Sequence, residues 1–409
     1  MTIPGHRPRI LYLTQFFEPE GVFKGLEFAK ALRKRGFDVE VATGIPNYPF
    51  GKILPGYKLR PYRRETMDGI VIHRLLLYPS HDASTMRRSL NYLSFCATAF
   101  LFCLLRGRRY DAIYVYHPPM TVGFAAALAG VVTRTPFIVD IQDLWPDSVT
   151  ASGMSNGWID RGLSAMCSFV YRRAARVVAQ CAGMGAKLAE RGASTDKVRT
   201  IYNWADERAI LPQGRLDLET FGFDGRFTFL YGGNFGPHQA LTTVVDAAVK
   251  AAAEEPSIQV LLVGGGLDEP NIAARIAAHA TQAVRIVPGV PQVQVADVFA
   301  AADVLLIHLA DLDFFEFTVP SKTQFYLASG KPILGGLAGE AAALIDQARA
   351  GCTVNPEDVH ALARAMVAMA RTNPAELRAM GERGARFYRQ TLSFTRAMDD
   401  TAEAIREIV

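Results

Sequence analysis

The 409-residue chain has few cysteines and lacks the commonest fingerprints of nucleotide chemistry. Its five cysteines are scattered and odd in number, which argues against a disulfide framework or a zinc site and indicates free thiols in a reducing compartment. No Gly-x-Gly-x-x-Gly motif is present, which disfavours a dinucleotide-dependent oxidoreductase. The glycine-rich loop at residues 231–241 lacks the Lys-Ser/Thr pair of a P-loop, and this disfavours ATP hydrolysis.

The chain is equally poor in targeting and nucleic-acid signals. The apolar run near its start has the length of a strand, without the h-region and small-residue cleavage site of a signal peptide, so we expect a cytoplasmic protein. We find no helix-turn-helix, zinc-finger or RNA-binding aromatic pattern, and we expect no nucleic-acid partner. With 50% hydrophobic and 21% charged residues, the composition excludes a mainly disordered chain.

The two halves of the chain carry opposite net charge. Residues 1–200 contain 27 Lys and Arg against 15 Asp and Glu, whereas residues 201–409 contain 17 against 25. The length predicts roughly two to three domains, and the opposite signs indicate two domains with different tasks. The basic half is suited to an anionic membrane surface or an anionic acceptor.

Both halves alternate strand-length apolar runs with helical patterns, and this order predicts parallel sheets with helices packed on them. We therefore expect an α/β protein with two Rossmann-like, doubly wound domains, over residues 1–205 and 206–390, that face an interdomain cleft. Residues 206–223 are the best linker because they contain Pro and Gly and few apolar runs. Strands are expected at residues 9–17, 38–43, 112–116, 136–141, 227–231, 259–263 and 303–307, and helices at residues 25–35 and 240–253.

Residues 86–110 form the most apolar stretch of the chain, with arginines at both ends and no acidic residue inside. The few polar residues follow one helical stripe, and the remaining faces are apolar. The uninterrupted part, residues 89–105, is at the lower limit of length for crossing a bilayer. It is either a buried helix of the first domain or a helix lying in the membrane interface, and the basic flanks favour the interface.

Ligands of open parallel sheets bind beyond the carboxyl ends of the strands, so loops at these ends are the candidate sites. In the first domain, Asp143 follows a predicted strand and is placed either to act as a base or to cap the next helix. Four further first-domain residues occupy loops of this kind and are candidates for the acceptor side: Glu20, Gly21, Lys24 and His117.

The second domain has two candidate loops. Residues 231–241 contain three glycines between a strand and a helix, and such a loop can direct backbone N–H groups at a phosphate. Further along, Glu316 can accept hydrogen bonds from sugar hydroxyls, Lys322 can neutralise phosphate charge, and Gln324 can bridge a ribose diol. With Ser321, these residues form a nucleotide-sugar clamp at the start of a helix.

At these loops the sequence resembles glycosyltransferase family 4, whose members are retaining enzymes of the GT-B fold. It is most similar to the bacterial subgroup that builds cell-surface polysaccharides, such as the N-acetyl-fucosaminyl transferases of O-antigen assembly. The resemblance extends in family order over nearly the whole chain. The matching stretches are FFEPEGVFKGLEFAKALRKRGFDVEVATGIPNYPFGK, YVYHPPMTVG, VDIQDLWPDS, IYNWAD, YGGNFGPHQAL, LLVGGG and TVPSKTQFYLASGKPIL.

The resemblance implies a nucleotide-sugar donor in the second domain and an acceptor in the first. Two family positions that grip the donor are acidic and separated by seven residues, and here they are Glu316 and Gln324. A histidine-aspartate pair of many relatives corresponds to Gln142 and Asp143 here. The implied catalytic residues are Asp143, Glu316 and Lys322. The implied donor-binding residues are Gly232, Gly233, Asn234, Phe235, Gly236, Gly264, Gly265, Ser321 and Gln324.

The function implied by the resemblance is retaining transfer of an N-acetylated amino sugar from a UDP-sugar to a lipid-linked saccharide in O-antigen, capsule or exopolysaccharide assembly. We expect metal-independent chemistry, attachment to the inner face of the cytoplasmic membrane, and a C-terminal helix over residues 391–409 that packs on the first domain. Self-association is left open. The alternatives are a UDP-sugar 2-epimerase of the same architecture and a non-catalytic nucleotide-sugar-binding subunit of a membrane complex.

Overall fold

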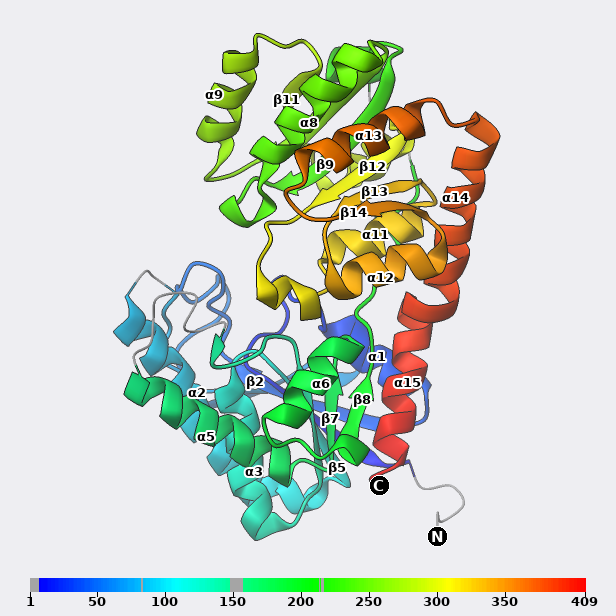
Figure 1. The fold of residues 1–409 in the computed structure, drawn as a ribbon. Coiled ribbons are helices and arrows are strands. Elements are labelled where there is room, and N and C mark those ends of the chain that lie inside the picture. Colours follow the sequence, from blue (N-terminus) through cyan, green and yellow to red (C-terminus); the bar gives the residue numbers. More distant parts are fainter. Residues whose placement is uncertain (1–6, 82–83, 148–156, 213, 215–216) are drawn as a thin grey trace. The chain divides into compact units, whose positions relative to one another are not determined.

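The computed structural model describes residues 7–81, 84–147, 157–212, 214 and 217–409. The chain folds into two compact units, the first made of Met1–Ile201 and Met398–Val409 and the second of Tyr202–Ala397 (Figure 1). The first unit thus ends at Ile201, close to the expected boundary at residue 205, and takes the end of the chain back.

The first unit is built on an eight-stranded sheet of order β3-β4-β2-β1-β5-β6-β7-β8. All neighbouring strands are parallel except β3 and β4, which form an antiparallel hairpin at one edge. The inner strands are apolar because helices cover them on both faces. The strands are β1 (Arg9–Thr14), β2 (Asp38–Gly44), β3 (Tyr62–Met67), β4 (Ile70–Leu75), β5 (Ala112–Tyr116), β6 (Phe137–Ile141), β7 (Arg176–Ala179) and β8 (Val198–Thr200).

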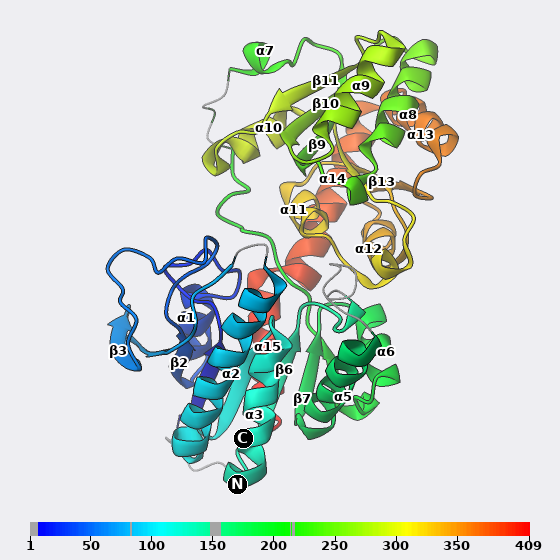
Figure 2. The ribbon, with the colours of Figure 1, turned by 90° about the vertical axis from the view of Figure 1, so that its left-hand side faces the viewer.

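Three helices of the first unit, α2, α3 and α5, lie side by side on one face of this sheet, and α1 and α15 lie on the other (Figures 1 and 2). α3 is buried over most of its length between α2, α5 and the sheet, which explains why it is apolar on every side. The helices are α1 (Leu26–Lys34), α2 (Thr85–Arg106), α3 (Met120–Thr133), α5 (Gly157–Arg173), α6 (Ala182–Glu190) and α15 (Phe394–Arg406), with a 3-10 turn η1 (Gly107–Arg109) after α2.

α15 connects the end of the chain to the first unit through ion pairs and buried apolar side chains. Asp399 accepts a hydrogen bond from Arg35 at 2.8 Å, and Glu407 accepts one from Arg199 at 2.9 Å. Met398 and Ile405 are almost completely buried. Residues 398–409 therefore form part of the first unit's fold.

The second unit has a six-stranded parallel sheet of order β11-β10-β9-β12-β13-β14. Its core lies where α8 and α13 pack on this sheet, with Val245 and Met366 fully buried. The strands are β9 (Phe227–Asn234), β10 (Ile258–Gly265), β11 (Val284–Pro288), β12 (Val304–His308), β13 (Ile333–Gly336) and β14 (Gly351–Val354). The helices are α7 (Leu218–Phe221), α8 (Leu241–Glu254), α9 (Glu269–His279), α10 (Val295–Ala301), α11 (Ser321–Ser329), α12 (Gly339–Ala348), α13 (Val359–Ala370) and α14 (Pro374–Phe387).

The predicted fold class, two Rossmann-like parallel sheets, is confirmed. Two details differ from the expectations. β1 ends at Thr14 rather than at residue 17, because the Thr14 hydroxyl donates to the carbonyl of Phe16 and the chain turns away from the sheet. The predicted linker contains the short helix α7, and its residues 213, 215 and 216 lie outside the described residues.

α2 contains most of the apolar stretch expected at residues 86–110, and its sides differ in exposure. Asn91, Phe95, Ala99, Phe102 and Cys103 are buried, whereas Met86, Leu90, Leu93, Leu101 and Leu105 are exposed. Among the described residues, the segment Thr85–Arg109 is the one helix long and apolar enough to cross a membrane, and 39% of its apolar window is buried inside the protein. α2 is therefore partly a core helix and partly an exposed apolar surface.

Candidate functional site

The predicted donor-binding residues gather at one edge of the second sheet. All its strands are parallel, so their carboxyl ends meet at that edge, and the strand order changes direction between β9 and β12. Ligands of open parallel sheets bind at such a switch point. The glycine-rich loop begins at the end of β9, and residues 316–324 follow β12. Gly233 and Gly264 are direct neighbours across β9 and β10.

Lys322, at the start of α11, is the central cation of this edge. Its Nζ donates a hydrogen bond to the Tyr231 hydroxyl, lies 3.8 Å from the centroid of the Tyr231 ring, and is 3.5 Å from Gln239 Oε1. Burial lowers its pKa to about 7. No carboxylate of the described residues forms an ion pair with this ammonium group. Lys322 is thus a half-desolvated cation that an anionic ligand would stabilise.

Glycine is required beside Lys322 for both a steric and a conformational reason. Gly233 has a φ of +135°, in the region that other residues avoid, and a Cβ there would lie 2.7 Å from Lys322 Cε. The Gly232 N–H donates to the hydroxyl of Tyr326, one turn after Lys322 on α11, at 3.0 Å. A side chain at position 233 would therefore displace Lys322.

The following part of the glycine-rich loop is hydrogen-bonded to the end of the neighbouring strand β10. Phe235 is fully buried, its N–H donates to the Gly265 carbonyl at 2.9 Å, and its carbonyl accepts from Asp268. Asn234 is exposed, and its carbonyl accepts a hydrogen bond from the Tyr231 hydroxyl at 2.7 Å. Phe235 therefore supports the loop, while Asn234 and the glycines offer accessible groups.

The clamp expected at residues 316–324 has two exposed members, Glu316 and Ser321, and one buried member, Gln324. Glu316 is exposed and lines a small cavity of about 30 Å³, and its backbone packs closely against Gly339, whose φ is +68°. Ser321 is exposed at the start of α11. Gln324 is only 2% exposed, and its amide nitrogen is best placed toward the carbonyl of Pro320 at 2.7 Å. In this structure Gln324 therefore supports the helix start instead of facing a ribose.

In the first unit, the candidate residues lie at the carboxyl ends of β1, β5 and β6 around Asp140. The Asp140 carboxylate is completely buried and forms an ion pair with Lys24, which is itself 1% exposed. It also accepts hydrogen bonds from the Tyr114 hydroxyl and the Gln142 amide, each at 2.6 Å. Lys24 is thus held inside the protein by this cluster, which positions the loop after β6.

Glu20 is also turned inward. Its carboxylate accepts hydrogen bonds from the backbone N–H groups of Phe17, Asn47 and Tyr48 at 2.7–3.0 Å, and burial raises its pKa. Gly21 is exposed, with open space around it. Three predicted acceptor-side residues lie in the loop after β1. Gly21 is accessible, whereas Glu20 and Lys24 are buried and stabilise the conformation of the loop.

Two of the predicted site residues in the first unit, His117 and Asp143, have bonding capacity that the described residues do not use. His117 is completely buried, which lowers its pKa to about 3, and its Nδ1 accepts from the Gln142 N–H at 3.4 Å. Its Nε2 has no hydrogen-bond partner among the described residues. Asp143 is exposed, and the protein atoms beside its carboxyl raise its pKa. The chain after Asp147 lies outside the described residues up to Gly157.

Tertiary structure adds functional residues that the sequence analysis left out. Tyr231 and Tyr326 flank Lys322, and Asp140 organises the first-unit cluster. The spacing of Lys322 and Tyr326, one helical turn, is the single signal that was available in the sequence. Within the part of the chain that the structure describes, no group of three or more His, Cys, Asp and Glu side chains could hold a metal ion.

Two family models match the chain, one in each half. Residues 26–204 match the model described as "Glycosyl transferase 4-like domain", and residues 226–372 match "Glycosyl transferases group 1". The chain is 26% identical over 276 residues to the probable glycosyltransferase WbjE of Pseudomonas aeruginosa, covering 65% of this chain and 68% of WbjE. It is 27% identical over 256 residues to the putative colanic acid biosynthesis glycosyl transferase WcaI of Escherichia coli, covering 59% of this chain and 61% of WcaI.

Solved structures share the fold over the whole length. HepE of Anabaena, crystallised in complex with UDP, superposes with a TM-score of 0.70 at 15% identity, covering 98% of this chain and 100% of HepE. The sucrose-phosphate synthase of Thermosynechococcus elongatus superposes with a TM-score of 0.71 at 16% identity, covering 98% of this chain and 99% of that enzyme. These similarities establish the fold.

Proposed function

Because the chain belongs to glycosyltransferase family 4, we propose that it transfers a sugar from a UDP-sugar to a saccharide acceptor in bacterial surface-polysaccharide assembly, with retention of configuration. The observation that carries this proposal is the ammonium group of Lys322, which forms no ion pair with any carboxylate of the described residues and lies beside the glycine-rich loop of the second unit. A diphosphate is the ligand chemistry that such a cation and closely approachable backbone would bind.

The comparisons support the donor and the process. WcaI is named for colanic acid biosynthesis, and HepE was crystallised with UDP, with UDP and glucose, and with UDP-glucose. WbjE is named as a probable glycosyltransferase. By extension, we propose that the donor of this chain is a UDP-sugar that carries an N-acetylated amino sugar. We propose that the acceptor is a lipid-linked saccharide.

The reaction breaks the bond between the anomeric carbon and the terminal phosphate oxygen and forms a new bond to an acceptor hydroxyl. Positive charge then develops on the sugar and negative charge on the leaving diphosphate. We assign charge stabilisation of the diphosphate to Lys322, with the accessible backbone around Gly233, and contact with the sugar hydroxyls to Glu316. Asp143 is assigned to the acceptor hydroxyl, which must lose its proton as the new bond forms.

Metal-independent transfer is part of this proposal. In many transferases a divalent cation neutralises the diphosphate, and here that task falls to Lys322 and backbone N–H groups. Activity that disappears in EDTA and returns only with added Mg²⁺ or Mn²⁺ would contradict this assignment.

We also propose that the protein works as a peripheral enzyme at the inner face of the cytoplasmic membrane. The exposed leucines of α2 and the arginines at its ends support this placement, because such helices lie in the membrane interface. A lipid-linked acceptor would be reached from that surface.

The deciding experiment is a thermal-shift screen of the intact protein with UDP, GDP and a panel of UDP-sugars, followed by transfer assays. A ligand that binds only the folded state raises the melting temperature by mass action. We expect UDP compounds to raise it, and we expect Lys322→Gln to weaken their binding at least about tenfold. Lys250→Gln, an exposed lysine of α8, is the matched control. No shift with any nucleotide would refute the donor assignment, and epimerised donor formed without acceptor would indicate an epimerase instead.

A further inference from the structure

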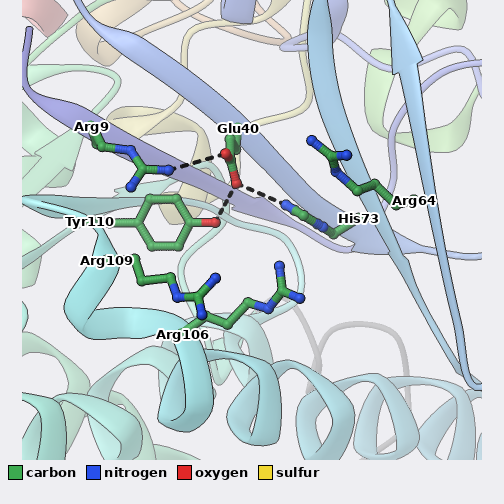
Figure 3. Close-up of a pocket in the computed structure, with 7 residues that line it drawn as sticks. All are labelled: Arg9, Glu40, Arg64, His73, Arg106, Arg109 and Tyr110. Atoms are coloured by element: carbon green, nitrogen blue, oxygen red, sulfur yellow. Dashed lines mark hydrogen bonds and ion pairs between the residues drawn. The ribbon is translucent and has the colours of Figure 1, made fainter.

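A second charged cavity lies in the first unit, at the edge of its sheet opposite the candidate acceptor residues. It has a volume of about 300 Å³. The amino ends of β1, β2 and β5 meet there, whereas the candidate acceptor residues follow the carboxyl ends of β1, β5 and β6. Its lining residues are Arg9, Glu40, Arg64, His73, Arg106, Arg109 and Tyr110 (Figure 3).

Glu40 is the one acidic side chain lining this cavity, and its bonding capacity is used internally. One carboxylate oxygen accepts from Arg9 at 3.3 Å, and the other accepts from His73 at 2.9 Å and from the Tyr110 hydroxyl at 2.6 Å. These hydrogen bonds, that of His73 foremost, lower the Glu40 pKa to about 2, so the carboxylate stays ionised. Arg9 and Glu40 therefore neutralise each other and form the base of the cavity.

Three other guanidinium groups surround the same cavity from different elements: Arg64 from β3, Arg106 from the end of α2 and Arg109 from η1 (Figure 3). None of them forms an ion pair with a carboxylate of the described residues. Arg106 is held in place by the rings of Tyr62 and Phe102, whose centroids lie 5.7 and 5.5 Å from its guanidinium carbon. Three convergent, uncompensated guanidinium groups make this cavity strongly attractive to anions.

We propose that this cavity is a phosphate-binding site, separate from the donor and acceptor sites. Arginine forks match the oxygen geometry of phosphate and bind it bidentately. The cavity has room for a phosphate together with an attached small group, since pockets for small ligands begin at about this size. The inference goes beyond the proposed transferase activity, because none of its residues belongs to that site.

Two sources could present the phosphate: the headgroup of an anionic phospholipid or a soluble phosphorylated compound. The position of the cavity at the end of α2 suits a headgroup, because the exposed Leu101 and Leu105 lie in the last turns of that helix. α2 is about 33 Å long, and Asn91 in its second turn accepts a hydrogen bond from Gln15 beside the end of β1, whereas the cavity lies at the other end of the helix. A bound headgroup would therefore hold the helix flat on the membrane at the end away from the acceptor loops.

The experiment compares Arg64→Gln and Arg109→Gln with Arg108→Gln in the full-length protein. Arg64 and Arg109 line the cavity from two elements, whereas Arg108 is an exposed neighbour outside the lining. Each of the three variants loses one positive charge. Two probes are used at physiological salt: inorganic phosphate, by calorimetry, and vesicles of phosphatidylglycerol with phosphatidylcholine, by co-flotation. UDP binding of each variant is measured in parallel to establish that it is folded and that the donor site is intact.

We expect Arg64→Gln and Arg109→Gln each to weaken binding of at least one probe about tenfold, while Arg108→Gln changes it less than about twofold. Loss of phosphate binding identifies a soluble ligand, and loss confined to anionic vesicles identifies a lipid headgroup. Equal effects of all three variants would reduce the site to general surface charge and overturn the proposal. Absence of binding to both probes by the natural protein would overturn it as well, whatever the result for UDP.

Discussion

The charged side chains of the candidate sites differ in whether a group of opposite charge lies beside them. Lys24 is buried against Asp140, so its charge is already satisfied and is unavailable to a ligand. Lys322 is partly buried and has no such carboxylate among the described residues, and this burial lowers its pKa to about 7. The same residue type therefore has a structural role in the first unit and a proposed binding role in the second, and the difference lies in the neighbouring side chains.

The lowered pKa of Lys322 predicts a pH dependence of donor binding. An anionic diphosphate binds the protonated ammonium, but above pH 7 the free protein holds this lysine increasingly in its neutral form. Affinity for a UDP-sugar should therefore fall by up to about tenfold per pH unit above 7, until the pH reaches the raised pKa of the complex. Calorimetric titrations between pH 6.5 and 9 measure this slope.

Two comparisons control this experiment. Lys322→Gln should bind more weakly but with a flat pH profile, because the titrating group is gone. Lys250→Gln should keep the natural slope. A slope that survives in Lys322→Gln would assign the pH dependence to another group.

Substitution of His117 should affect the stability and the activity of the protein differently. Its buried Nε2 lacks a partner among the described residues, and an unpaired polar group costs free energy in the folded protein. His117→Phe should leave the melting temperature nearly unchanged, because removal of the unpaired Nε2 offsets the loss of the hydrogen bond from the Gln142 N–H to Nδ1. We expect kcat/KM for transfer to fall at least about tenfold, because Gln142 directly precedes Asp143 and loses this hydrogen bond. Thermal unfolding and steady-state kinetics measure the two quantities. A variant with full activity would show that His117 does not position Asp143.

At the scale of single elements, α2 has one side that packs in the core and another that is exposed and apolar. Its inner side, with Phe95 and Phe102, completes the core, and its outer side exposes Leu93 and Leu101 at 58% and 52%. Hydrophobicity alone could not separate these sides, since both are apolar in sequence. The packing against α3 decides which side remains exposed.

The exposed side of α2 predicts a loss of membrane binding without a loss of folding. Leu93→Glu with Leu101→Glu should change the free energy of unfolding by less than about 1 kcal/mol, because neither side chain packs in the core. Binding to anionic vesicles should fall more than tenfold, since each leucine would contribute about 2 kcal/mol when buried in lipid. Co-flotation and thermal unfolding measure both quantities.

Leu211→Glu with Leu267→Glu is the matched control for this pair of substitutions. Leu211 and Leu267 are 71% and 90% exposed and belong to the second unit, so the control adds the same two negative charges elsewhere. Vesicle binding that survives in the α2 variant, or that falls equally in the control, would exclude α2 as the membrane contact.

At the scale of the whole molecule, the chain crosses between its two units twice. It leaves the first unit after Ile201 and returns at Met398, so the end of the sequence stabilises a unit formed mainly by its beginning. The contacts of Asp399 with Arg35 and of Glu407 with Arg199 join residues more than 200 positions apart. The stability of the first unit therefore depends on α15.

This dependence predicts that a core substitution in α15 destabilises the first unit selectively. Ile405 is 1% exposed, and truncation of such a side chain costs about 2–5 kcal/mol. Ile405→Ala should lower the calorimetric transition of the first unit by roughly 5–15 °C and leave UDP binding by the second unit unchanged. Glu403→Ala, exposed on the same helix, should have little effect. A uniform loss of both transitions would argue against two separate units.

Much of the fold was predictable because regular elements follow local sequence rules. The strand at β5 and the helix at α8 appear where the apolar period places them. The β3–β4 hairpin was missed, although Asp68 and Gly69 have positive φ angles of 47° and 78° and form the two-residue turn that Asp-Gly favours. Its strand β3 is largely exposed, so it lacks the apolar pattern on which the prediction relied.

The sequence by itself determined the two parallel sheets, the glycine-rich loop after a strand and the apolar character of α2, because periodicity and turn chemistry act between near neighbours along the chain. Only the tertiary structure decided that Lys322 meets Tyr231, that Lys24 and Glu20 face inward, that Gln324 is buried, and that three arginines surround Glu40. Burial and the pairing of charges depend on residues distant in sequence, and these properties determine which side chains a ligand can reach.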